Sequence, residues 1–206
     1  MIKRFFLFIK VFYAVTILLL IAGCSMTIPS TVIYNLYLPN IHAQDTAKQE
    51  SGAPQLAYEL TIIVQSPNYL SQPYIAYRDS QYKVESSKYA KWDESPDKLV
   101  GEEFRYKISK MNVFERVNVT SGNMAKSYVL NIYLKRFERV DEGEAAFSEC
   151  SYDFEISSPD SVRPLYTGSF YKKNKLADKS YLELAKGLSS ALDEGIKEVQ
   201  SHVIKI

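Results

Sequence analysis

Residues 128–157 read YVLNIYLKRFERVDEGEAAFSECSYDFEIS, and this stretch decides the fold. Its first part places apolar residues at every second position, namely Tyr128, Leu130, Ile132 and Leu134. A period of two is typical of a half-buried strand. The polar residues 141–144 then predict a turn, and a second strand is expected over 145–157. With a third strand expected over 165–172, the short connections predict an antiparallel meander.

Two helices and further strands are expected around this meander. Ser95-Pro96 begins a helix over 96–111, because serine caps the free N–H groups and proline loses no needed donor at the first helical position. Ser180 and Glu183 form a capping box that begins an amphipathic helix over 180–203. Other strand-like segments are 32–38, 58–65, two pieces of 75–84 around a turn at 78–80, and 113–120. The predicted fold class is a single α/β domain (α+β-like), with a mixed, mostly antiparallel sheet of about five to seven strands and two main helices.

The N-terminus has the features of a lipoprotein signal. Lys3 and Arg4 precede an apolar run over 11–21, which is shorter than the roughly 20 apolar residues of a membrane span. Ile21-Ala22-Gly23-Cys24 then places small residues before a cysteine. We expect residues 1–23 to be removed, Cys24 to carry the lipid, residues 24–31 to form a tether and residues 32–206 to form the domain. The alternative is a signal-anchor, or a cleaved signal with an accidental cysteine.

A stripe of small residues, Gly187, Ala191 and Gly195, runs along the C-terminal helix. A glycine costs a helix about 1 kcal/mol relative to alanine, so two of them call for a reason. One interpretation is a close approach of the helix to the sheet or to a partner. The other is a helix that merely tolerates two glycines, and the sequence does not separate the two.

The second strand of the meander carries a cysteine on its apolar face. That face comprises Ala146, Cys150, Tyr152, Phe154 and Ile156, interrupted by Ser148. The chain has two cysteines, so lipidation of Cys24 leaves no intramolecular disulfide. The apolar surroundings predict a buried, inert thiol at Cys150 in preference to a reactive one.

No motif for catalysis or cofactor binding stands out. The two histidines, His42 and His202, lie in a polar loop and near the last residue, which argues against a Ser-His-Asp or zinc site. The chain has no glycine-rich phosphate loop. Removal of the basic signal leaves a chain close to neutral, which argues against nucleic acid. We therefore expect no catalytic residue, metal or cofactor, and neither an enzyme nor the ATPase of a transporter.

Three short motifs follow one another in the first half of the domain: Pro67-x-Tyr69-Leu70, Ile75-x-Tyr77-Arg78 and Tyr89-x-x-Trp92-x-Glu94. They come after the lipid-attachment sequence and a Tyr34-x-Leu36 segment. This order resembles the ABC-type transport auxiliary lipoproteins, which accompany intermembrane lipid-transport systems with MCE-domain proteins. The resemblance covers residues 34–199, nearly the whole mature chain. Asp93 departs from the small residue more usual at its position, and the loop over 39–54 is rather long.

The resemblance implies a non-catalytic protein that is anchored to the periplasmic face of the outer membrane through the lipid on Cys24. Ser25, next to the cysteine, agrees with outer-membrane sorting under the usual rule. The implied partners are an MCE-domain protein and the ABC permease and ATPase, and a homo-oligomer is compatible with the family. The family fold, an α/β domain with a mixed sheet, agrees with the fold expected from the residues themselves.

The three motifs also define a structural or partner-contact cluster. Its residues are Pro67, Tyr69, Leu70, Tyr77, Arg78, Trp92 and Glu94. Within it we expect the Arg78 guanidinium to lie over the Trp92 indole and to pair with the Glu94 carboxylate. An architectural role is favoured over a lipid or partner site.

Two other functions compete with the transport role. One is an envelope lipoprotein that scaffolds or regulates cell-wall enzymes. The other is a periplasmic hydrolase, which the scarcity of histidines disfavours. Neighbouring genes for a permease, an ATPase and an MCE-domain protein would favour transport, whereas genes for cell-wall synthases would favour the regulator.

Overall fold

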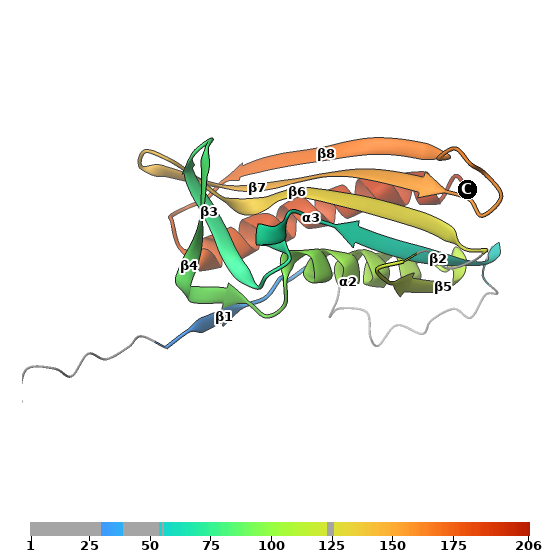
Figure 1. Ribbon diagram of the computed structural model, residues 1–206, viewed down its shortest axis with the longest axis horizontal. Coiled ribbons are helices and arrows are strands. Elements are labelled where there is room, and N and C mark those ends of the chain that lie inside the picture. Colours follow the sequence, from blue (N-terminus) through green and yellow to red (C-terminus); the bar gives the residue numbers. More distant parts are fainter. Residues whose placement is uncertain (1–29, 39–53, 55, 123–125) are drawn as a thin grey trace, which may run out of the picture. The chain divides into compact units, whose positions relative to one another are not determined.

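In the computed structural model, three consecutive strands form the antiparallel meander that the sequence predicts (Figure 1). They are β6 (Tyr128–Glu142), β7 (Ala145–Ser157) and β8 (Tyr166–Lys175). Gly143 turns the chain between β6 and β7 with a φ of 59°, a left-handed conformation that glycine adopts without strain. The structure describes residues 30–38, 54, 56–122 and 126–206.

The remaining strands extend the sheet from the other edge of β6. β2 (Leu56–Gln65) runs parallel to the first half of β6, and β5 (Phe114–Val119) runs parallel to β2. β3 (Tyr74–Ser80) is parallel to the far end of β6, where it pairs with Arg139 and Val140. β4 (Lys83–Trp92) forms a hairpin with β3, and the short β1 (Val32–Tyr34) pairs with β4. The strand order is β1-β4-β3-β6-β2-β5, with β7 and β8 on the opposite edge of β6.

The mixed α+β fold class is confirmed, with differences of detail. The described residues form eight strands, against five to seven predicted. The two longest pairings, β6 with β7 and β7 with β8, are antiparallel. The four parallel pairings are shorter: β1 with β4, β2 with β5, β2 with β6 and β3 with β6. The turn expected at 78–80 was misplaced, because Arg78, Asp79 and Ser80 belong to β3 and the chain turns at residues 81–82.

The first strand is also shorter than the predicted segment 32–38, because the backbone N–H groups that follow it donate hydrogen bonds to side chains and not to a neighbouring strand. The Leu36 amide donates to the side-chain oxygen of Asn35 at 2.8 Å. The Tyr37 amide donates to the Ser189 hydroxyl at 3.0 Å, which ties this segment to the C-terminal helix instead of to a strand. Pairing with β4 therefore ends at Tyr34.

Both helices lie on the same side of the sheet (Figure 1). α2 (Pro96–Ser109) packs on β2 and β5, and α3 (Tyr181–Val203) packs on β7 and β8. The Glu183 amide donates to the Ser180 hydroxyl at 3.2 Å, which is one half of the predicted capping box. The other half does not form, because the Ser180 amide donates to Asp178 and the Glu183 carboxylate accepts from Lys186. Ser95 occupies the N-cap position of α2 without a side-chain cap hydrogen bond, and its hydroxyl contacts the Asp97 carboxylate instead.

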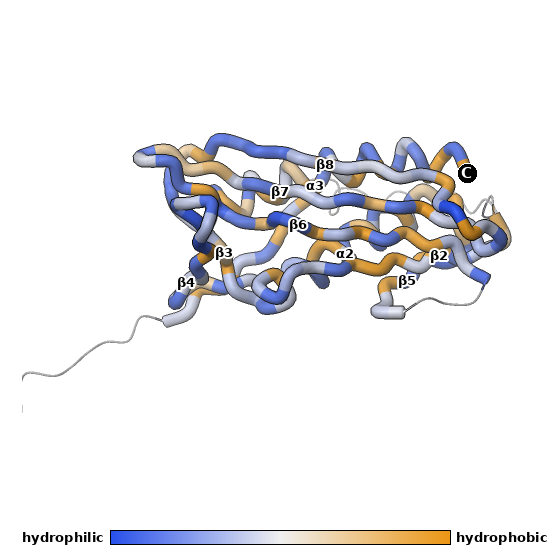
Figure 2. The backbone as a smooth tube through the Cα atoms, turned by 45° about the horizontal axis from the view of Figure 1, so that its top comes forward, coloured by the Kyte–Doolittle hydropathy of each residue, from blue (hydrophilic) through white to orange (hydrophobic). Residues whose placement is uncertain are grey.

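The inward residues of β7 form the centre of the core beneath α3. Cys150, Tyr152 and Phe154 are fully buried, and hydrophobic residues are interleaved with hydrophilic ones along the strands (Figure 2). Burial raises the pKa of the Cys150 thiol to about 12. The thiol is therefore protonated at physiological pH, which confirms the prediction of a buried, inert cysteine.

The glycines of α3 allow the helix to lie directly against the sheet. A Cβ atom on Gly187 would come within 2.5 Å of the Ser148 hydroxyl oxygen. A Cβ atom on Gly195 would overlap the Tyr152 hydroxyl and lie 2.9 Å from the Phe170 ring. Of the two interpretations of the small-residue stripe, the structure supports close approach to the sheet.

The predicted signal peptide 1–23 and the lipid-attachment residue Cys24 lie outside the described residues, so the predicted division into signal, tether and domain stays a prediction. Residues 31–206 form one unit in the structure. Within the part of the chain that the structure describes, neither helix has the length and hydropathy of a membrane span.

Replacing Gly195 with alanine should destabilise the domain. The added methyl group overlaps the Tyr152 hydroxyl and crowds Phe170, and overpacking of this kind costs about 1–3 kcal/mol. This cost exceeds the gain of about 1 kcal/mol in helix propensity. Urea denaturation of Gly195→Ala should therefore show a lower free energy of unfolding than wild type.

Two matched variants identify the contact. Ser190→Ala puts alanine at an exposed position of the same helix and should be neutral or slightly stabilising, because alanine has the higher helix propensity. Tyr152→Phe removes the overlapping hydroxyl, which has no hydrogen-bond partner, and should recover part of the loss in the double variant. A gain in stability for Gly195→Ala alone would show that α3 does not approach the sheet this closely.

Candidate functional site

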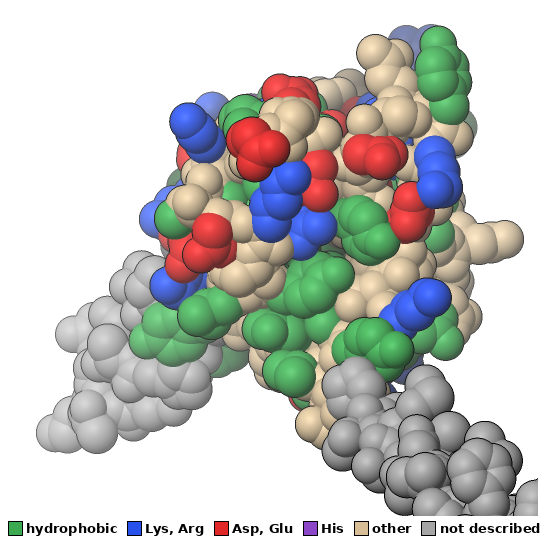
Figure 3. Space-filling view, turned by 90° about the vertical axis from the view of Figure 1, so that its left-hand side faces the viewer, with side chains coloured by type: hydrophobic (Ala, Val, Ile, Leu, Met, Phe, Trp, Pro, Cys, Tyr) green, Lys and Arg blue, Asp and Glu red, His purple; other side chains and the backbone are tan. Residues whose placement is uncertain are grey.

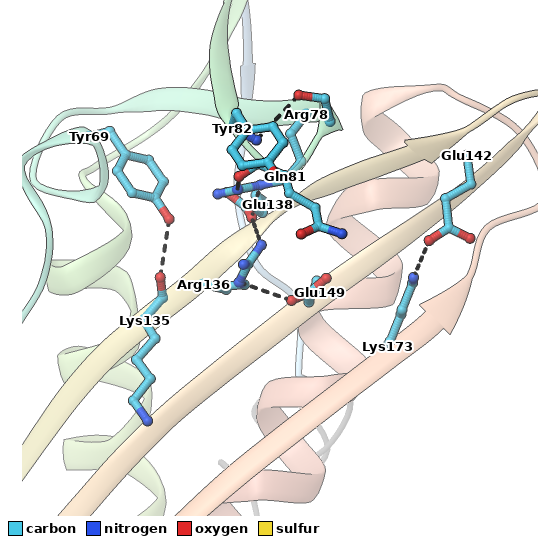
Figure 4. A network of polar contacts seen from close by, with 11 residues as sticks. Tyr69, Arg78, Gln81, Tyr82, Lys135, Arg136, Glu138, Glu142, Glu149 and Lys173 are labelled. Atoms are coloured by element: carbon cyan, nitrogen blue, oxygen red, sulfur yellow. Dashed lines mark hydrogen bonds and ion pairs between the residues drawn. The ribbon is translucent and has the colours of Figure 1, made fainter.

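The structure does not bring the predicted cluster together at one place. Tyr69 and Arg78 meet on the face of the sheet that the helices leave open (Figure 4). Leu70 and Trp92 are fully buried in the core. Tyr77 lies at the end of the molecule near β1. Pro67 precedes the short 3-10 helix η1 (Asn68–Leu70), and Glu94 is exposed ahead of α2.

A chain of ion pairs crosses the open face from β3 to β7 (Figure 4). The Arg78 guanidinium holds both oxygens of Glu138, with Nε 2.6 Å from Oε1 and Nη2 donating to Oε2 at 3.0 Å. Arg136 then joins Glu138 to Glu149, at 3.0 and 3.1 Å. Glu138 is fully buried, because the β3–β4 hairpin covers it. The four charges alternate in sign, so each buried carboxylate has a cationic neighbour.

The network shifts the ionisation of the residues that the motifs singled out. Burial opposes the charge on Arg78, but its hydrogen bond to Glu138 and the charge of that carboxylate outweigh burial and raise the pKa of the guanidinium. Burial and the nearby Glu138 carboxylate raise the pKa of Tyr69 to about 12. Its hydroxyl donates to the Lys135 carbonyl at 3.1 Å, which fastens η1 to β6. These shifts keep Arg78 charged and Tyr69 neutral.

The expected pairing of Arg78 with Glu94 is wrong. Glu94 pairs with Lys98 one helical turn along, at 3.0 Å, and both side chains are largely exposed. The Trp92 indole packs against Phe137, with ring centroids 5.8 Å apart, in the core. Phe137 and Glu138 are adjacent on β6 and therefore point to opposite faces of the sheet. Trp92 and Arg78 thus lie on opposite sides of the same strand, so the expected position of the guanidinium over the indole is also wrong.

Tyr77 belongs to a second cluster, on the helix side of the sheet. The Arg139 guanidinium lies 5.2 Å from the ring centroids of both Tyr77 and Tyr181. Asp141 accepts two hydrogen bonds from Arg139, at 2.9 and 3.0 Å. Arg139 thereby joins β3, β6 and the start of α3.

A hollow of about 580 Å³ lies beside the Arg139 cluster, between β1, β4 and the start of α3. Tyrosines and small polar residues make up most of its lining, including Tyr34, Tyr77, Tyr89 and Tyr181. Hydrophobic side chains gather on the lower half of this end of the molecule, and charged ones on the upper half (Figure 3). This end of the molecule therefore offers an amphipathic surface.

The structure brings together no group of three or more His, Cys, Asp or Glu among the described residues that would hold a metal ion. His202 stacks on Tyr166, with ring centroids 3.5 Å apart. The network residues Arg136, Glu138 and Glu149 were missed from the sequence, because in the sequence they look like ordinary exposed charges of a strand.

Removing the Arg78 charge should destabilise the domain strongly. Arg78→Met leaves the buried Glu138 with Arg136 as its cationic partner, and breaking a buried pair from one side costs about 3–5 kcal/mol. The matched control is Lys98→Met, which breaks the exposed pair with Glu94 and should cost less than about 1 kcal/mol. Urea denaturation measures both.

The double variant Arg78→Met with Glu138→Met removes both charges of the pair. It should be more stable than Arg78→Met alone, because no buried carboxylate is left without its main partner. Equal stability of the Arg78→Met and Lys98→Met variants would show that the Arg78–Glu138 pair does not support the fold.

Two crystal structures have the fold of this chain. One is a protein from Xanthomonas campestris, with 15% identity, a TM-score of 0.64, and coverage of 82% of this chain and 92% of that chain. The other, an uncharacterized protein, has 15% identity, a TM-score of 0.63, and coverage of 84% and 99%. At this identity the likeness concerns the fold alone. No curated protein matches the sequence.

The comparison with family models identifies the family as well as the fold. The model of the ABC-type transport auxiliary lipoprotein component matches residues 37–199, which takes in the meander, both helices and the Arg78–Glu138 network. By its description, the family is an auxiliary lipoprotein component of ABC-type transport. The chain belongs to the ABC-type transport auxiliary lipoprotein component family.

Proposed function

We propose that this protein is the non-catalytic auxiliary lipoprotein of an MCE-associated ABC transporter that moves lipid between membranes. It is anchored through a lipid on Cys24 to the periplasmic face of the outer membrane. The observation that carries the proposal is the family match over residues 37–199, which follows directly on a lipid-attachment sequence at 21–24. An MCE-domain protein and the ABC permease and ATPase are its partners.

The open face of the sheet supports a binding role. Both helices cover the other face, so the β3–β4 hairpin and the β8 strand are available to a partner. Tyr82 at the hairpin tip is 98% exposed, and Tyr171 on β8 is 61% exposed. Exposed tyrosines of this kind are common anchors in protein interfaces.

The ion-pair network supports this surface in the proposal. A hollow of about 460 Å³ lies beneath the hairpin tip, lined by charged residues that include Arg78, Arg136, Glu149 and Lys173. Arg78 holds the hairpin in place through Glu138 and through the Gln81 carbonyl, to which it donates at 3.4 Å. In this proposal the motif residues Tyr69 and Arg78 position the partner surface, and Leu70 and Trp92 stabilise the core beneath it.

Photo-crosslinking in intact cells tests the partner. A photoreactive phenylalanine analogue at Tyr82 or Tyr171 should capture an MCE-domain protein, since both side chains extend from the proposed surface. The matched control is the analogue at Ser190, an exposed position on α3 at the helix side of the sheet, which should capture less. Capture of a second copy would indicate the homo-oligomer that the family allows. Cell-wall synthases captured in place of an MCE-domain protein would favour the envelope regulator.

Mass spectrometry and membrane fractionation test the anchor. The mature protein should begin at Cys24 with acyl groups attached and should fractionate with the outer membrane. Cys24→Ala should abolish both the acylation and the membrane association, because no other cysteine lies near the cleavage point. A mature wild-type protein without acyl groups would rule out the lipid anchor.

A further inference from the structure

Large apolar side chains are concentrated at the end of the domain that carries β1. We call them the β1-end surface, which comprises Val32, Ile33, Tyr37, Tyr74, Tyr89 and Leu182. Each of these side chains is between 49% and 60% exposed. The hydrophobic area of this end is visible on the lower half of Figure 3. Soluble surfaces carry single exposed apolar residues routinely, but a contiguous group indicates a contact.

The strand register places Ile33 and Tyr74 in one row across the sheet, and Val32, the preceding residue of β1, points to the opposite face. Ile33 lies opposite Lys91 on β4, and Lys91 lies opposite Tyr74 on β3. Val32 and Tyr89 line the same hollow. Tyr37 and Leu182 line an adjoining hollow of about 280 Å³. The surface therefore spans β1, the paired strands and the first turn of α3.

We propose that the β1-end surface lies against the lipid bilayer and holds the domain at the membrane. This inference rests on the lipid anchor of the proposed function. Val32 is only eight residues beyond Cys24 in the sequence. A fully extended chain of that length spans roughly 28 Å at most, so the anchor keeps β1 close to the headgroups. Weak contacts then suffice, because the tether makes them intramolecular.

The composition of the surface fits the interface between lipid and water. Tyrosine is favoured there because its ring is apolar and its hydroxyl stays hydrated, and Val32, Ile33 and Leu182 supply aliphatic groups. Lys88 lines the hollow and is exposed, and Lys91 lies between Ile33 and Tyr74. Such lysines extend their stems along apolar surface and place the ammonium among lipid phosphates. The Glu85 carboxylate is occupied by Tyr77 and Lys83.

Spin labelling of the full-length, lipidated protein in vesicles of phosphatidylethanolamine and phosphatidylglycerol tests this proposal. Single cysteines at Ile33→Cys and Leu182→Cys report on the surface, and Val162→Cys, which is fully exposed in the loop between β7 and β8, is the matched control. The buried Cys150 does not react, and Cys24 carries the lipid. We expect the labels at 33 and 182 to contact lipid-bound relaxation agents, and the label at 162 to contact only water-soluble ones.

The outcomes separate this inference from the anchor on which it rests. Vesicle flotation with all three labels equally exposed to water overturns the inference and leaves the anchor intact. If the labels at 33 and 182 are shielded from both agents and their spectra are broadened by a second spin, another copy of the chain covers the surface. This outcome also overturns the inference. Failure to float with the vesicles overturns the anchor and the inference together. Unchanged thermal unfolding of each variant shows that the fold is preserved, as the exposure of the replaced side chains predicts.

Discussion

The rest of the structure depends on the edge of β6, which pairs with two different strands. β2 pairs with β6 up to Tyr133, and β3 pairs only with Arg139 and Val140. Between them the described residues of β6 have no strand neighbour on that edge, and the register also shifts between Leu134 and Arg136 on the β7 side. Backbone groups without a strand partner need another one. The Tyr69 hydroxyl supplies it for the Lys135 carbonyl.

The same gap explains why charges are buried on an otherwise ordinary sheet. Beyond its pairing with β2, strand β6 is covered by the β3–β4 hairpin, so Glu138 is shielded from water. Arg78 and Arg136 compensate its charge from the hairpin and from β6 itself. Two of the motif residues, Tyr69 and Arg78, therefore meet where β3 joins the sheet. The proposed function links architecture and partner binding here, because the hairpin that Arg78 holds also presents the exposed Tyr82.

Local periodicity predicted the elements whose determinants lie close together in the sequence. The meander, the cap at Ser180 and the burial of Cys150 each follow from neighbouring residues. The pairing of Arg78 with Glu138 could not be predicted from neighbouring residues, because the two are sixty positions apart and only the sheet topology brings them together. Glu94 is closer to Arg78 in the sequence than Glu138 is, but it lies just ahead of α2 and pairs with Lys98 of that helix. Likewise, the length of β1 depends on Ser189 of a helix that the early sequence does not reveal.

The tight seat of α3 on the sheet has a consequence for secretion. The apolar face of β7 is covered only when α3 packs on it, with Gly187 against Ser148 and Gly195 against Tyr152. These glycines come late in the chain. A chain threaded through a translocation channel from its N-terminus therefore presents a bare sheet until its last helix has passed. In the export that we propose, the core therefore cannot close before α3 has crossed the membrane, which keeps the preceding strands from folding early.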